Sequence, residues 1–222
     1  MKDFISYFAL ALGALLPVVN PIGSSLVFLG MVGPAPTGVF RTLARKIALS
    51  TAIFLLAMDV AGTAVLKLFG ISLPVMQLAG GIVLASMGWQ LLNKKDVPDQ
   101  PSSSPLSSNL DRLNGKIFYP FTFPVTAGPG VLVVMLTLSA HASKGGFLQI
   151  AFAQLGVLAG MALMCAAVFF FYAYAPAITA KVPQSTAHGI LRVIAFILFC
   201  IGVQIAWNGL SALLATQGLF KS

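Results

Sequence analysis

The chain contains six apolar stretches, each long enough for a helix to cross a lipid bilayer, which takes about twenty mostly apolar residues. The stretches cover residues 4–32, 44–69, 73–93, 117–140, 147–175 and 189–215. No segment between them is long enough to fold as a soluble domain. This pattern predicts an all-α integral membrane protein with six transmembrane helices.

The composition excludes a soluble protein. Of the 222 residues, 58% are hydrophobic and only 8% are charged, whereas a soluble domain carries roughly 25% charged residues. The net charge of +8 does not indicate nucleic-acid binding, because the basic residues are scattered between apolar stretches and form no concentrated basic face. We therefore expect the lipid bilayer as a partner, and no nucleic acid.

The residues that usually bind metals are few and scattered. Cys165 and Cys200 both lie inside apolar stretches, and no metal-ligand spacing connects them. The two histidines, His141 and His188, lie near the ends of stretches. We expect no metal site and no cofactor, and we interpret both cysteines as small core residues.

The longest interruption between apolar stretches, residues 94–116, divides the chain into two halves. Its first part, 94–105, is rich in Ser and Pro, which is typical of a linker. Residues 1–93 and 106–222 then contain three of the six stretches each. The predicted domains are two three-helix units joined by this linker.

The first stretch of each half is interrupted by two prolines four residues apart, Pro17 and Pro21 in one and Pro120 and Pro124 in the other. Proline removes a backbone donor and clashes with the preceding turn, so two of them open a helix. Each half therefore has one broken span followed by two unbroken ones. Because three crossings are an odd number, the second half enters the membrane in the opposite orientation, which predicts two inverted repeats. This architecture is common among secondary transporters. The alternative is a pair of kinks used for packing.

Each break would leave backbone groups free near the middle of the membrane, which is tolerated only in buried or wet surroundings. Helix N-termini favour anions, so they could bind a substrate carboxylate with nearby hydroxyl groups as additional donors. Freed carbonyls and the Asn20 amide could accept from an ammonium group. For each hydroxyl, the alternative is a bond to a carbonyl of its own helix. The predicted substrate-binding residues, for a small zwitterion, are Asn20, Pro21, Gly23, Ser24, Thr122, Thr126, Gly128 and Gly130, with Ser25 as a further donor.

Asp59 is the only acidic residue deep inside an apolar stretch. An aspartate at that depth costs roughly 2.5–3.5 kcal/mol on the insertion scale, so it should face the helix bundle and have a partner. Asp59 is therefore a candidate for coupling transport to a proton or a sodium ion. The alternative is a protonated or hydrogen-bonded packing residue.

Five short segments of the chain carry a resemblance, namely residues 20–23 (Asn-Pro-Ile-Gly), 69–74, 79–81 (Ala-Gly-Gly), 124–130 (Pro-Val-Thr-Ala-Gly-Pro-Gly) and 202–204 (Gly-Val-Gln). They resemble signature segments of the MarC family, in the same order along the chain. The resemblance implies a six-span inner-membrane protein of bacteria or archaea, related to the SnatA neutral amino acid transporters and grouped with the LysE-type exporters. One position departs from the family pattern, because Gln77 stands where the family has an Arg before Ala-Gly-Gly.

We therefore expect a secondary transporter of small neutral amino acids or related small metabolites. The alternative is a channel or a non-transporting partner in a larger membrane complex, and a homo-oligomer is compatible with each of these functions. Enzyme activity is not expected, because the chain has no zinc-protease helix motif, no nucleophile elbow and no phosphate-binding loop. Aspartyl-type cleavage needs two intramembrane acids, and Asp59 stands alone.

The placement of basic residues predicts the orientation. With six spans, the two termini and the loops after the second and fourth spans share one side, which holds four basic residues, whereas the other side holds nine. Short loops rich in Lys and Arg stay in the cytoplasm, so both termini should face outward. Tyr172 and Tyr174, near the end of the fifth stretch, fit the aromatic belt of the membrane interface.

Reporter fusions test this topology. Fusions after Lys95 and after Lys181 should report a cytoplasmic position, and a fusion at the C-terminus should report an external one, because the nine-residue basic side stays inside. A cytoplasmic C-terminus would contradict both the orientation and the six-span count.

Overall fold

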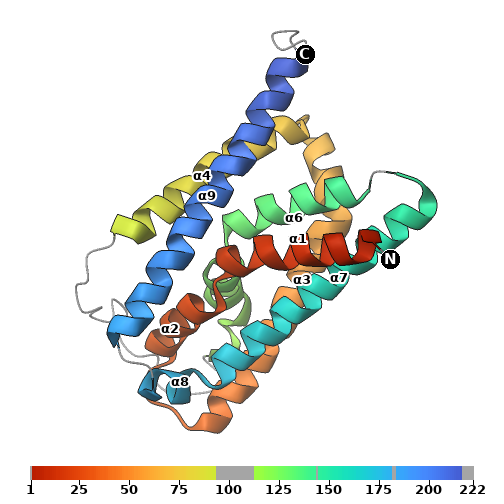
Figure 1. Ribbon diagram of the computed structural model, residues 1–222. Helices are drawn as coiled ribbons and strands as arrows, with labels where there is room; N and C mark the ends of the chain where they lie inside the picture. Colours follow the sequence, from red (N-terminus) through yellow and green to blue (C-terminus); the bar gives the residue numbers. More distant parts are fainter. Residues whose placement is uncertain (1, 94–112, 144, 182–183, 217–222) are drawn as a thin grey trace.

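The computed structural model describes residues 2–93, 113–143, 145–181 and 184–216 (Figure 1). The prediction of an all-α fold is confirmed, since these residues form helices and no strand. The predicted linker, 94–105, lies outside the described residues. The elements are α1 (Lys2–Val19), α2 (Pro21–Val32), α3 (Thr37–Leu68), α4 (Leu73–Asn93), η1 (Ile117–Thr126), α6 (Pro129–Ala142), α7 (Phe147–Ala173), α8 (Ala175–Lys181) and α9 (Gln184–Thr216).

Four segments of the described residues are long and apolar enough to cross a membrane, namely Lys2–Val32, Leu73–Asn93, Phe147–Ala173 and Arg192–Ala215. A fifth is formed by η1 and α6 together, which are bent by 71° relative to each other. These five correspond to five of the six predicted stretches. The remaining stretch, 44–69, is covered by α3, which is not among the five, so the count of six spans stays a prediction.

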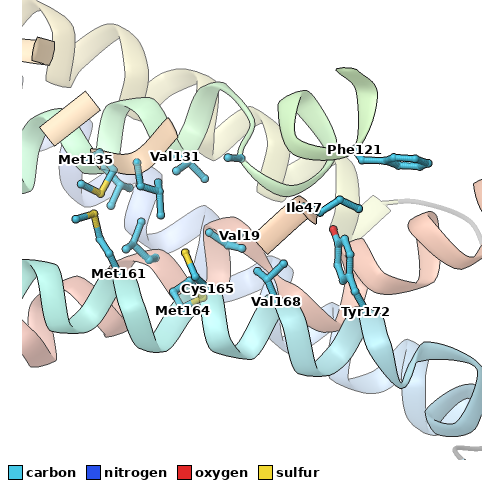
Figure 2. Close-up of a cluster of buried hydrophobic side chains, with 14 of the residues drawn as sticks. Val19, Ile47, Phe121, Val131, Met135, Met161, Met164, Cys165, Val168 and Tyr172 are labelled. Atoms are coloured by element: carbon cyan, nitrogen blue, oxygen red, sulfur yellow. The ribbon is translucent and has the colours of Figure 1, made fainter. Parts of the chain in front are cut away.

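The helices form two groups (Figure 1). The first group is α4 and α9, which lie side by side at one edge of the molecule. The second group gathers around α7, which contacts α1, α2, α3 and α6. Buried apolar side chains fill the space between α7 and these neighbours, among them Val131, Met135, Met164 and Val168 (Figure 2). Both broken spans therefore adjoin the same helix.

Glycines allow the backbones of α4 and α9 to touch. Gly81 and Gly88 of α4 are seven residues apart, and so are Gly202 and Gly209 of α9. A Cβ atom on Gly81 would collide with the backbone of Gly202 and Ala206, and one on Gly202 would collide with the backbone of Gly81 and Ala85. The contacts are thus reciprocal, and the two helices run antiparallel. Small residues permit this close approach in membranes, where packing drives helix association.

A methyl group on Gly81 tests this packing. Gly81→Ala should lower the free energy of unfolding by about 1–3 kcal/mol, because the new Cβ meets backbone that cannot rotate away. Thermal unfolding in detergent measures the change. The matched control is Gly30→Ala, since a Cβ on Gly30 meets nothing within 4 Å. Equal midpoints for the two variants would contradict the close contact.

Candidate functional site

The first break is a single residue. Asn20 stands between α1 and α2 with φ 45° and ψ 65°, in the left-handed region, which asparagine tolerates better than most residues. Its Oδ1 accepts a hydrogen bond from the N–H of Gly23 at 3.1 Å and so caps α2. Pro21 occupies the first position of α2, where its missing N–H has no intrahelical role. The helix therefore ends and restarts at Asn20.

The second break extends over a whole segment. In η1, Tyr119 (φ −119°, ψ 123°) and Phe123 (φ −119°, ψ 126°) have extended backbones, because the proline that follows each of them disfavours the helical region. The turns between them are wide, with the N–H of Ala127 donating to the carbonyl of Thr122 at 2.8 Å. The sequence predicted two breaks of the same form, whereas in the structure the first break is a single residue and the second extends over η1.

The two breaks lie next to each other. A Cβ atom on Gly130, at the start of α6, would come within 3.1 Å of the Val18 side chain at the end of α1 and would collide with Leu84 of α4. Phe28 of α2 packs edge-on against Phe121 of η1, with ring centroids 5.3 Å apart. The two broken spans thus contact each other at these positions. By contrast, a Cβ on Gly128 would meet only the Pro124 carbonyl oxygen, at 3.0 Å.

Tyr172 of α7 connects the two breaks. Its side chain is fully buried, its ring stacks on Phe28 at 4.7 Å, and its hydroxyl lies 2.7 Å from Thr126 Oγ1. The prediction that Tyr172 belongs to an interfacial belt is wrong. Tyr174 is 39% exposed and has the Arg41 guanidinium 5.4 Å from its ring centroid. Figure 2 shows Tyr172 near Phe121 and Ile47.

A signal for this burial is present in the sequence. Met161, Cys165, Val168 and Tyr172 recur at intervals of three or four residues, which places them on one face of a helix. All four are buried. The position of Tyr172 near the end of an apolar stretch suggested the interface, whereas its register with the buried face indicates the core.

The predicted hydroxyl donors all bond to carbonyls of their own segments. Ser24 Oγ donates to the carbonyl of Asn20 at 2.8 Å, Thr122 Oγ1 to that of Ile117 at 2.8 Å and Thr126 Oγ1 to that of Phe121 at 2.6 Å. Ser25 does the same with Ile22 at 2.7 Å. A hydroxyl has one proton and two lone pairs, so these groups retain acceptor capacity only. It follows that Tyr172 is the donor in its bond with Thr126.

Asp59 lies apart from the breaks, at the interface of α3 and α6. Its side chain is only 9% exposed, and Ser139 Oγ donates to its backbone carbonyl at 2.7 Å. Its Oδ1 has no hydrogen-bond partner within the described residues. Ser139 stands ten residues beyond Pro129, so Asp59 is roughly 15 Å along α6 from the second break. The structure does not bring Asp59 into the group of residues at the breaks.

Side chains fill the space between the breaks in this conformation. Phe28, Leu84 and Tyr172 are all fully buried there. Two open grooves of about 380 Å³ each lie elsewhere, one between α3 and η1 and one between α1 and α9. Within the residues that the structure describes, no group of three or more His, Cys, Asp or Glu side chains could hold a metal ion.

Two substitutions of Tyr172 distinguish the contribution of its hydroxyl to stability from that of its ring. Tyr172→Phe should lower the free energy of unfolding by about 1 kcal/mol, because only the hydrogen bonding of the hydroxyl with Thr126 and Ser24 is lost. Tyr172→Ala should lower it by about 3–5 kcal/mol, because a cavity replaces the ring. Thermal unfolding in detergent measures both. Tyr174→Phe is the control and should leave stability unchanged. An equal loss of stability in Tyr172→Phe and Tyr172→Ala would contradict separate roles for the hydroxyl and the ring.

Comparison with known proteins agrees with this architecture. Residues 5–214 match the model of the MarC family integral membrane protein. The chain is 30% identical over 232 residues to the inner membrane protein MarC of Escherichia coli O157:H7, covering 98% of this chain and 100% of the relative. It is 28% identical over 211 residues to the membrane protein YvbG of Bacillus subtilis, covering 95% and 93% respectively. No solved structure matches. The chain therefore belongs to the MarC family of multi-pass integral membrane proteins.

Proposed function

We propose that the chain is a secondary transporter of small neutral amino acids or related small metabolites in a bacterial inner membrane. The observation that carries this proposal is the meeting of the two broken spans, where Gly130 adjoins Val18 and Tyr172 joins Phe28 to Thr126. Helix breaks in the corresponding positions of two halves are the best sequence pointer to the binding site of a transporter. Relatives named as inner membrane proteins support the localisation.

The breaks supply complementary groups for a zwitterion. The N-termini of α2 and α6 carry a positive partial charge that favours a carboxylate. The lone pairs of the Ser24, Thr122 and Thr126 hydroxyls, whose protons are already donated, favour an ammonium group. Such a site recognises both ends of a neutral amino acid without a charged side chain. Asp59 is our candidate for binding the coupling proton or sodium ion, at a distance from the substrate.

Two inverted repeats, residues 1–93 and 106–222, agree with the helix contacts. The third spans of two such repeats run antiparallel, and a two-fold axis in the membrane plane makes their contacts reciprocal. The contacts of Gly81 and Gly202 have this form. In this proposal the linker 94–105 is cytoplasmic and both termini face outward. Transport requires the two halves to move apart at the breaks, which Phe28 and Tyr172 close in the described conformation.

Uptake and counterflow assays in proteoliposomes test the proposal directly. The purified chain should exchange at least one labelled neutral amino acid faster than protein-free vesicles, and a saturating concentration of that amino acid should block the exchange. Flux that does not saturate would favour a channel. No flux of any common amino acid would remove the basis of the substrate assignment and favour a non-transporting partner.

A substitution at Asn20 tests the site. Asn20→Asp keeps a side-chain acceptor for the Gly23 N–H and tolerates the left-handed backbone, but its negative charge repels a substrate carboxylate at the start of α2. Uptake of neutral amino acids should fall roughly tenfold, as expected for about 1.4 kcal/mol of repulsion. Asn20→Gly removes only the side-chain cap of α2, so it should reduce uptake by less than Asn20→Asp does.

The control for added charge is Asn114→Asp. Asn114 Oδ1 accepts from Lys46 Nζ at 2.7 Å, so a carboxylate is readily accommodated there. This variant should transport like the parent chain. If Asn20→Asp also folds and transports like the parent, the start of α2 does not bind the substrate.

A further inference from the structure

Two amide side chains face away from the protein near the middle of a membrane span. Gln204 and Asn208 of α9 are both exposed, and Gln204 lies close to the midpoint of the apolar segment Arg192–Ala215. Lipid tails offer no hydrogen-bond partner at this depth, where an unsatisfied polar group is unfavourable. The exposure of two amides at this place therefore needs an explanation.

The two amides satisfy only part of each other's hydrogen-bonding groups. Gln204 Nε2 donates to Asn208 Oδ1 at 2.9 Å. An amide side chain has two donors and an acceptor with two lone pairs. Within the described residues, the Gln204 carbonyl oxygen and the Asn208 N–H groups have no further bond. The pair therefore presents one strong acceptor and several donors to its surroundings.

The opposite face of α9 is already occupied by α4. Gly202 and Gly209, which contact the α4 backbone, are buried. Cys200, Gln204 and Asn208 follow one another at intervals of one helical turn, so they form a stripe on the exposed side. We call these three residues the amide stripe. Figure 1 shows α4 and α9 at the edge of the molecule, where another chain can approach.

We propose that two copies of this chain associate through the amide stripes of their α9 helices. Two copies in one membrane share one orientation, so a two-fold axis along the membrane normal places each residue of α9 opposite its own copy. An amide is both donor and acceptor, so Gln204 and Asn208 can bond to the same residues of the second copy. A lipid chain cannot do this. Hydrogen bonds between helices stabilise such pairs in membranes.

The chain carries its own reporter for this interface. Cys200 is exposed on the amide stripe, whereas Cys165 is buried. Oxidation of the full chain in proteoliposomes with copper phenanthroline should therefore join two copies through Cys200. The covalent dimer should form in Cys165→Ser and be absent in Cys200→Ser. Donor- and acceptor-labelled copies should also show energy transfer at high lipid dilution.

Replacing the amides by leucine distinguishes this interface from random collision. Gln204→Leu with Asn208→Leu should weaken association about tenfold, because the bonds between copies are lost while both side chains remain compatible with lipid. The matched control is Gln90→Leu, since Gln90 is an exposed amide of α4 bonded to Ser86 and lies outside the amide stripe. Its cross-linking should equal that of the parent.

Three results would overturn the proposal. The first is no cross-link and no energy transfer in the parent while Cys200 still reacts with a membrane-permeant maleimide. The second is an unchanged cross-linking yield in the double leucine variant. The third is lost transport in that variant without any association of the parent, which would assign the amide stripe to the substrate path.

Discussion

Inside a bilayer, each backbone N–H and carbonyl needs a partner from the protein itself, and four prolines in two spans remove that partner locally. The structure restores it by three means. Asn20 caps the restarted helix, the wide turns of η1 rejoin N–H groups to more distant carbonyls, and hydroxyls such as those of Thr122 and Thr126 donate to carbonyls that have lost their usual N–H. The hydroxyls at the breaks thus donate their protons to the backbone, and their lone pairs remain for a ligand.

This constraint also explains where the two spans meet. Broken backbone is tolerated only against protein or in a wet cavity, and both breaks adjoin α7. Tyr172 fills the space with an aromatic ring and contributes one hydroxyl where polar groups remain. The pairing of α4 with α9 through glycine is a separate contact, and α4 also reaches the second break, where Leu84 packs against Gly130.

The sequence predicted much of this architecture, because helix length, proline position and family signatures are local signals. The all-α fold is confirmed, the chain restarts its helix at Asn20 as expected, and the family assignment is confirmed. The burial of Tyr172 was missed, because burial depends on which helices pack together and not on distance from the end of a span. The unequal form of the two breaks was missed for a related reason. Proline spacing is the same in both, yet one residue, Asn20, leaves the helical region at the first break, whereas two, Tyr119 and Phe123, do so within η1.

The first break has a mechanical consequence. Between α1 and α2, the departure from helical dihedrals is confined to Asn20, with helix on either side. In the other span, the bend is spread over η1, where Tyr119 and Phe123 are extended and each is followed directly by a proline. The first broken span can therefore bend at a single residue, whereas prolines restrict the backbone of the second. A motion that separates the two halves would rotate α2 about Asn20 and carry η1 along as a rigid piece, so the two repeats would contribute unequally to the same movement.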